Sequence, residues 1–233
     1  MNDYLPYLIP LLAAHFFTDF LLQPRRWVLH KERRKHRSLF LYLHSFIAGF
    51  LAYLLLGAWH WWPVLVVTAL SHGLIDLAKL HLQQLPKMPH LFFYDQLSHL
   101  AVVGLLSLVA FQEGVPAPAY STHFISIYGL TLYLLTVPVG MSVKAFFQAT
   151  QLSLQATEEL SGAGRWIGYF ERLLLFFLVL QGEYIAIGFL ITAKSIIRFD
   201  QTQDRAHSEY VLLGTLISFS AAFGLAYAAQ PLL

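Results

Sequence analysis

Histidine and aspartate recur four residues apart at three places in the first hundred residues of the chain. The three pairs are His15 with Asp19, His72 with Asp76, and Asp95 with His99. Residues i and i+4 lie on one face of an α-helix, so each pair can present an imidazole and a carboxylate to the same site. The chain has no cysteine, and imidazole with carboxylate suits Zn, Mn or Fe(II). Three such pairs predict a metal or catalytic centre, with zinc as the expected ion.

The predicted ligands also include His44, which lies near the start of the next apolar segment. The full set is His15, Asp19, His44, His72, Asp76, Asp95 and His99. An aspartate that is not needed as a ligand, Asp19 or Asp95, is the candidate general base. Polar neighbours that could orient the ligands by hydrogen bonding are Gln23, Ser71 and Gln96. In the alternative interpretation, the pairs hydrogen-bond between helices and stabilise their packing without an ion.

The composition indicates that membrane-spanning helices carry these residues. Hydrophobic residues make up 57% of the chain and charged residues 12%, whereas soluble domains have about 25% charged residues. So little charge excludes both an ordinary soluble surface and a disordered chain. The net charge of +2 gives no indication of nucleic-acid binding. The predicted fold class is therefore all-α, a polytopic transmembrane helical bundle.

Seven segments are apolar over the roughly 20 residues that a spanning helix needs. They cover residues 4–22, 39–58, 62–80, 95–112, 122–141, 170–192 and 210–230. The polar stretch 142–169 is predicted to be a cytoplasmic amphipathic helix followed by a glycine-rich turn. We expect two modules, with 1–112 carrying the His/Asp motifs and 113–233 carrying a cluster of Glu, Arg and Lys.

The loop between the first two segments carries the strongest charge signal in the chain. Residues 23–38 contain seven Lys or Arg and one acidic residue, Glu32. The positive-inside rule places this loop in the cytoplasm and the N-terminus outside, and each His/Asp pair then lies toward the inner leaflet. The stretch 194–209 conflicts with this topology, because it would lie outside with three Lys or Arg. Either segment 170–192 is broken or re-entrant, or one span is misassigned.

A second set of polar residues lies in the C-terminal third of the chain. Arg172, Lys194 and Arg198 are candidates for an anion or lipid-headgroup site. The alternative is structural, because Glu–Arg and Glu–Lys pairs could dock the last two spans against each other. Gly214 and Ser218 are four residues apart and would allow these helices to approach closely.

These motifs resemble those of a bacterial membrane family called domain of unknown function 3307. The matching motifs are His15-x3-Asp19-Phe-x-Leu-Gln23, His44, Ser71-His72-x3-Asp76 and Asp95-Gln96-x2-His99. Runs around Gly168-x2-Glu171-Arg172, Ala193-Lys194-Ser195 and Gly214-Thr215-Leu216 resemble the longer members. The resemblance implies a multi-pass protein of the bacterial inner membrane. The His/Asp pattern is more distantly similar to membrane-bound metal-dependent hydrolases.

Three functions follow from a buried His/Asp cluster. The first is a metal-dependent hydrolase that acts on a lipid or lipid-linked substrate at the cytoplasmic leaflet, since a bound metal ion lowers the pKa of its water. The second is a cation or proton-coupled transporter, because the same groups could carry ions through the bundle. The third is a non-catalytic membrane scaffold with structural His/Asp pairs. The sequence leaves the substrate, the metal and a homo-oligomeric state open.

Overall fold

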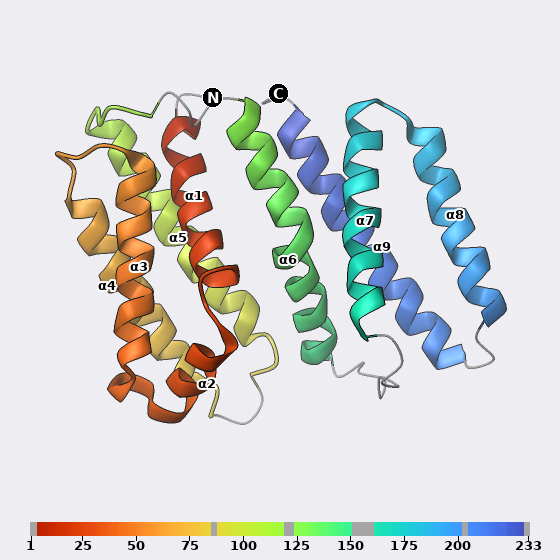
Figure 1. Ribbon diagram of the computed structural model, residues 1–233, viewed down its shortest axis with the longest axis horizontal. Coiled ribbons are helices and arrows are strands. Elements are labelled where there is room, and N and C mark those ends of the chain that lie inside the picture. Colours follow the sequence, from red (N-terminus) through yellow and green to blue (C-terminus); the bar gives the residue numbers. More distant parts are fainter. Residues whose placement is uncertain (1–3, 85–87, 119–123, 151–160, 202–204, 231–233) are drawn as a thin grey trace. The chain divides into compact units, whose positions relative to one another are not determined.

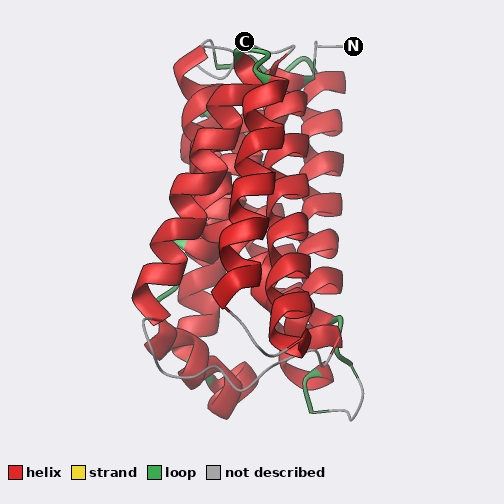
Figure 2. Cartoon of the chain, turned by 90° about the vertical axis from the view of Figure 1, so that its right-hand side faces the viewer, coloured by secondary structure: helices red, strands yellow, loops and turns green. Residues whose placement is uncertain are grey.

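The computed structural model describes residues 4–84, 88–118, 124–150, 161–201 and 205–230. All regular structure within these ranges is helical, which confirms the predicted all-α class (Figures 1 and 2). The residue contacts divide the chain into two compact units, Met1–Ser126 and Ile127–Leu233. The sequence analysis placed the boundary between the two modules at residues 112 and 113, whereas the observed boundary lies between Ser126 and Ile127. The His/Asp motifs all fall in the first unit.

The first unit is built on four long helices. They are α1 (Leu5–Phe20), α3 (Leu39–Leu56), α4 (Pro63–Leu82) and α5 (Leu91–Gln112). Helices α1 and α4 each pack against both α3 and α5, and consecutive long helices run in opposite directions (Figure 1). This arrangement brings the C-terminal halves of α1 and α4 beside the N-terminal halves of α3 and α5.

Small residues allow α3 and α4 to pack closely. A side chain at Gly49 of α3 would collide with the carbonyl oxygen of Leu65 and with Ala69 on α4. A Cβ at Gly73 of α4 would lie 2.9 Å from the hydroxyl of Ser45. Glycine and serine at such positions let helix backbones approach within a membrane, where packing replaces the hydrophobic driving force. This close approach helps to bring His44 on α3 and His72 on α4 within reach of each other.

The predicted basic loop 23–38 contains a helix. Helix α2 (Arg25–Arg34) follows Pro24 and is bent by 80° from α1, and a short 3₁₀ helix, η1 (Lys35–Arg37), continues it. Trp27 of α2 stacks on Phe40 of α3, with ring centroids 5.1 Å apart. The loop prediction was therefore wrong, because one aromatic face holds this basic segment against α3 in a helical conformation.

The second unit contains α6 (Phe124–Thr150), α7 (Ser161–Leu180), α8 (Tyr184–Gln201) and α9 (Arg205–Ala229). Helix α6 continues nine residues beyond the predicted end of its span, so residues 142–150 belong to it. The predicted turn at Gly162–Gly168 is part of α7, while residues 151–160 lie outside the described structure. Segment 170–192 is interrupted at Gly182, whose φ of +73° reverses the chain between α7 and α8. These two helices form a contacting hairpin.

Five of the described helices are long and apolar enough to cross a membrane, namely α3, α4, α5, α6 and α9. The bent pair of α1 and α2 would make a sixth span if it crosses as one unit. Seven spans were predicted. The difference arises largely in segment 170–192, because the turn at Gly182 divides it and leaves Tyr184–Ile196 as a shorter apolar stretch. The helices nevertheless identify a membrane protein.

Candidate metal centre

The structure brings together the seven residues with predicted ligand groups. Helix α1 contributes His15 and Asp19, α3 contributes His44, α4 contributes His72 and Asp76, and α5 contributes Asp95 and His99. Six of them are at most 5% exposed, and the side chain of Asp19 is 11% exposed. Antiparallel packing explains the convergence. Helices α1 and α4 carry their His/Asp pairs toward their C-terminal ends, whereas His44 and the pair on α5 lie toward the N-terminal ends of their helices.

Three ligand atoms face one another most closely. Asp19 Oδ1 lies 3.3 Å from His44 Nε2 and 3.2 Å from His72 Nε2. The two imidazole nitrogens are 3.0 Å apart. Ligands bound tetrahedrally to zinc at about 2.0–2.1 Å are separated from one another by roughly 3.3 Å. The triangle formed by Asp19, His44 and His72 therefore has the size of one face of a zinc coordination sphere.

Hydrogen bonding alone does not account well for this triangle. A neutral imidazole carries one N–H, and a carboxylate carries none. His44 Nε2 nonetheless faces the Asp19 carboxylate, His72 Nε2 and the side-chain amide nitrogen of Gln23 at 2.6 Å. Asp19 Oδ1 is buried without a hydrogen-bond partner among the described residues. The Gln23 amide nitrogen is a donor, so the argument rests on Asp19 Oδ1 and the two imidazole nitrogens, which lie within 3.3 Å of one another. Buried polar atoms are normally paired, and these three atoms fit a shared cation better than a set of hydrogen bonds.

A second group of ligand atoms lies beside the first. Asp95 Oδ1 and His99 Nε2 are 3.6 Å apart, and within the described structure neither has a hydrogen-bond partner. Together with Asp19 they form a set whose ligand atoms all lie within 4.8 Å of one another. The second oxygen of Asp76, Oδ1, lies 3.9 Å from His99 Nε2.

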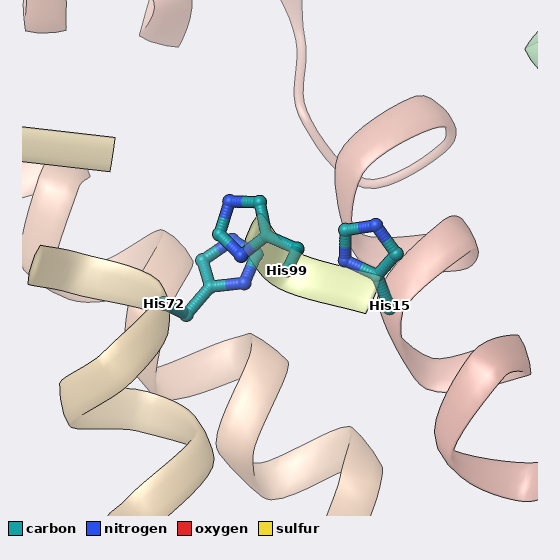
Figure 3. A group of neighbouring side chains, drawn as sticks. All are labelled: His15, His72 and His99. Atoms are coloured by element: carbon teal, nitrogen blue, oxygen red, sulfur yellow. The ribbon is translucent and has the colours of Figure 1, made fainter. Parts of the chain in front are cut away.

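Three of the imidazoles form a further set of the same kind. His15, His72 and His99 come from α1, α4 and α5 and lie side by side (Figure 3). The ring centroid of His99 lies 4.2 Å from that of His72 and 5.1 Å from that of His15. His72 and His99 thus belong to more than one group, so the groups are parts of one continuous cluster.

Gln96 connects three members of the cluster. Its amide nitrogen donates to Asp19 Oδ2 at 3.1 Å and to Asp95 Oδ2 at 3.3 Å. Its amide oxygen lies 3.3 Å from His15 Nε2. Such contacts fix the orientation of ligands before an ion binds. Of the other residues expected to orient ligands, Gln23 contacts His44, whereas Ser71 donates to the Val67 carbonyl of its own helix.

The sequence analysis missed two lysines that belong to the cluster. Lys31 Nζ donates to Asp76 Oδ2 at 2.5 Å, and Lys79 Nζ donates to Asp95 Oδ2 at 2.7 Å. Lys79 stands three residues after Asp76 and seven after His72, so helical spacing could have indicated its position. Lys31 could not be distinguished from the other basic residues of 23–38, although it is 4% exposed. Asp19 is left as the carboxylate of the cluster with no lysine partner among the described residues.

A small cavity reaches the cluster from its apolar side. His15, His72 and His99 line it together with apolar side chains that include Leu11, Ala52 and Leu106. The cavity has room for about one water molecule. The imidazoles therefore adjoin a space whose remaining lining is mostly apolar but includes the hydroxyl groups of Thr68 and Ser71.

The three basic residues of the predicted anion site have different surroundings. Arg172 is buried and donates to the carbonyl oxygens of Leu135 and Thr136 on α6 and to Ser218 Oγ on α9. Lys194 is paired with Glu171. The side chain of Arg198 lies outside the described structure.

The bonds from Arg172 lie next to a proline in α6. Pro138 has no N–H to give to the preceding turn of its helix, and proline within a helix commonly disturbs the neighbouring hydrogen bonds. Arg172 supplies donors to carbonyl groups of that turn. Its described contacts are therefore those of a residue that joins α7 to α6 and α9, and they favour the structural alternative for this cation.

Comparison with known proteins assigns a family to the chain. Residues 7–127 match the family described as "Protein of unknown function (DUF3307)". This match covers the described helices of the first unit and all seven predicted ligands, whereas the resemblance noted beyond residue 127 lies outside it. No curated protein and no solved structure matches the chain. Because the match spans more than half of its residues, the chain belongs to the family of proteins of unknown function DUF3307.

Proposed function

We propose that this protein is a metal-dependent hydrolase of the bacterial inner membrane that acts on a lipid or lipid-linked substrate at the cytoplasmic leaflet. The observation that carries the proposal is the triangle of Asp19 Oδ1, His44 Nε2 and His72 Nε2, with edges of 3.0–3.3 Å. Its atoms match the donor types and spacing of a zinc site. The group is buried in helices whose composition suits a membrane.

The residues of the cluster can be given separate roles in this proposal. Asp19, His44 and His72 would hold the ion, and a bound ion would supply a water of lowered pKa and polarise a phosphoryl or acyl oxygen. Asp95 is the candidate general base, because its Oδ1 is buried and unpaired while Lys79 holds its other oxygen. Gln96 orients Asp19 and Asp95 relative to each other.

The cavity supports hydrolysis over a purely structural cluster. A structural zinc site is closed by protein ligands, whereas a catalytic site keeps a position for water or substrate. The space beside His15, His72 and His99 has room for about one water molecule. Its mostly apolar lining, which also includes Thr68 and Ser71, suits a substrate that enters from the membrane.

The exposed basic residues of helix α2 favour a substrate with an anionic headgroup. Arg25, Arg26, Arg33 and Arg34 are exposed on α2, while Lys31 on the same helix reaches Asp76. Basic residues beside a membrane attract anionic lipids, at about 1 kcal/mol for each Lys or Arg near the surface. Helix α2 would therefore concentrate such lipids next to the candidate metal centre.

A transporter is the second candidate, favoured by the lysine–aspartate pairs. Lys31 with Asp76 and Lys79 with Asp95 are ion pairs within a membrane bundle, and such pairs often lie on ion or proton pathways. Transport predicts flux across sealed vesicles, whereas hydrolysis predicts turnover in detergent micelles. The two functions are therefore separable by the preparation in which activity is observed.

The test is an assay of the zinc-loaded protein in detergent with phosphate esters and acyl esters of lipids. We expect turnover that is abolished by a chelator and restored by zinc, and an Asp19→Asn variant without turnover. Glu113→Gln is the matched control, because Glu113 is exposed at the end of α5. A folded, zinc-loaded protein that hydrolyses neither class of ester but carries cations across vesicles would favour the transporter.

We also propose a topology that removes the charge conflict of the C-terminal half. If α7 and α8 cross the membrane as two passes, residues after α8 return to the side of α2. Lys194, Arg198 and Arg205 then lie toward the cytoplasm, in agreement with the positive-inside rule. The turn at Gly182 supports this interpretation, because it joins two contacting helices of 20 and 18 residues.

Single cysteines introduced into this cysteine-free chain should report the topology. We expect Glu32→Cys to react with a membrane-impermeant maleimide only after the cytoplasmic face is opened. Glu113→Cys and Gln181→Cys should react in intact cells. All three positions are exposed, whereas Ser38 in the basic segment is fully buried and would label poorly. Labelling of Gln181→Cys from the cytoplasmic side, or from neither side, would contradict the two-pass hairpin.

A further inference from the structure

The cluster offers more ligand groups than one zinc ion can use. Four histidines and three aspartates converge, while a zinc ion in a protein takes about four ligands. We infer that the cluster holds two divalent ions bridged by Asp19, and that the phosphate group of a lipid phosphate ester completes this centre. The inference rests on the proposed metal site and specifies its stoichiometry and substrate class. In the two-ion centre Asp95 is a ligand of the second ion and no longer the general base.

The ligand atoms separate into two adjacent sets. His44 and His72 face Asp19 on one side, at 3.3 and 3.2 Å from its Oδ1. Asp95 and His99 form the other set with Asp19, and all their ligand atoms lie within 4.8 Å of one another. Asp19 is the residue common to both sets, and a carboxylate has two oxygens with which to bridge two ions.

The spacing of the two sets suits a two-metal centre. Ions in such centres lie about 3.5–4 Å apart. The rings of His72 and His99, one from each set, have centroids 4.2 Å apart. The two sets are therefore adjacent, and Asp19 belongs to both, as a carboxylate that bridges two ions must.

The unpaired atoms of the cluster are distributed over both sets. Asp19 Oδ1 and His44 Nδ1 are unpaired on the first side, while Asp95 Oδ1 and His99 Nε2 are unpaired on the second. Asp95 and His99 are each at least nine-tenths buried. One ion at the first set would leave two buried polar atoms of the second set without a partner, which is costly in a medium of low dielectric constant.

The lysines leave one oxygen of each paired carboxylate available. Lys79 occupies Asp95 Oδ2 and leaves Oδ1, which lies 3.6 Å from His99 Nε2. Lys31 occupies Asp76 Oδ2 and leaves Oδ1, which lies 3.9 Å from the same nitrogen. The lysines thus hold these carboxylates in place while their other oxygens lie within 3.9 Å of His99 Nε2 in the second set.

The charges of the cluster indicate what completes it. Three aspartates and two lysines leave one net negative charge, so one divalent ion already makes the centre positive. A second divalent ion would leave a large buried positive charge, which requires a compensating anion. A phosphate group carries the needed charge and can bridge two ions through separate oxygens. The second ion and a phosphate should therefore bind together.

The test counts the ions bound to chelator-stripped, full-length protein reloaded with Mn²⁺, with and without inorganic phosphate. We expect about two ions per chain in phosphate, with the spin-coupled paramagnetic resonance of a manganese pair. Phosphate should raise the affinity for the second ion by about 10-fold or more. Asp95→Asn keeps the side-chain shape and should bind one ion with no coupling, and His99→Gln should do the same. Glu113→Gln is the control and should match the unmodified protein.

One ion per chain at saturating Mn²⁺ and phosphate would overturn the two-ion inference and leave the proposed single-metal hydrolase intact. If two ions bind with the same affinity in the presence and absence of phosphate, the inferred phosphate-ester substrate is wrong. Coupled ions that persist in both Asp95→Asn and His99→Gln would show that the second set is wrong. A protein that binds no ion would overturn the proposed function together with this inference.

Discussion

Replacing His72 with alanine should remove the zinc ion held by Asp19, His44 and His72 from the purified protein. His72 Nε2 lies 3.0 Å from His44 Nε2 and 3.2 Å from Asp19 Oδ1, and this imidazole belongs to two of the three candidate ligand groups. Loss of a ligand should weaken binding by more than the roughly 10- to 100-fold that loss of a supporting contact costs. Elemental analysis of detergent-purified protein, together with a competitive zinc titration, measures the change.

His81→Ala is the matched control for this variant. His81 lies on α4 as well, but it is exposed and its Nδ1 bonds the carbonyl oxygen of Leu77 within the same helix. We expect His81→Ala to retain the zinc content of the unmodified protein. Folded His72→Ala protein with the zinc content and zinc affinity of the unmodified protein would refute the assignment of this residue as a ligand.

Acid should have the same effect as the His72 substitution. An imidazole must be neutral to bind a metal, so protons and zinc compete for its nitrogen. Because falling pH favours the protonated imidazole, zinc should leave the unmodified protein below about pH 6 and return as the pH rises. Helical content measured across the same range distinguishes release of the ion from unfolding.

Much of the candidate site could be predicted from helical spacing alone. His15 with Asp19 and Asp95 with His99 lie on single helix faces because their separations match one turn. The opposite order of the second pair suits an antiparallel neighbour, and α1 and α5 are packed in that way. Spacing did not identify which atoms meet, because the rotation of each helix about its axis depends on packing.

The two lysines show where pattern reasoning fails. A lysine stem spans several ångströms, so its charged head can lie in water or reach inward from the same backbone position. Lys31 reaches inward because α2 is bent by 80° from α1 and packs on α3 through Trp27. That bend depends on tertiary contacts, so neither the charge of 23–38 nor its composition could reveal it.

Glycine was misleading in the second unit for a related reason. Gly162, Gly164 and Gly168 suggest a turn by composition, yet α7 includes all three. At Gly168, the space that a side chain would fill is taken by the guanidinium of Arg172, 3.2 Å from an ideal Cβ. Gly182 is the glycine that does turn the chain, with φ at +73°. Which glycine turns the chain depends on its neighbours in space, and the local sequence pattern does not show these neighbours.

Removing the charge of Lys31 should destabilise the metal-free protein more than removing the whole ion pair does. Lys31 and Asp76 are 4% and 5% exposed, and their charged atoms are 2.5 Å apart. Breaking a buried pair from one side leaves an uncompensated charge and costs about 3–5 kcal/mol, whereas replacing both partners with apolar residues is often neutral. We therefore expect Lys31→Met to unfold at markedly lower temperature and the double variant Lys31→Met, Asp76→Leu to recover most of the loss.

Thermal unfolding in detergent with a chelator present measures this effect without any contribution from an ion. Arg34→Met is the control, because Arg34 is exposed on the same helix and surface charges contribute little. A Lys31→Met variant as stable as Arg34→Met would mean that Asp76 finds another partner or a proton when the lysine is lost. Recovery in the double variant would instead show that the Lys31–Asp76 pair adds little net stability to the fold. That result is expected when Asp76 is needed beside His99 to bind an ion rather than to stabilise the protein.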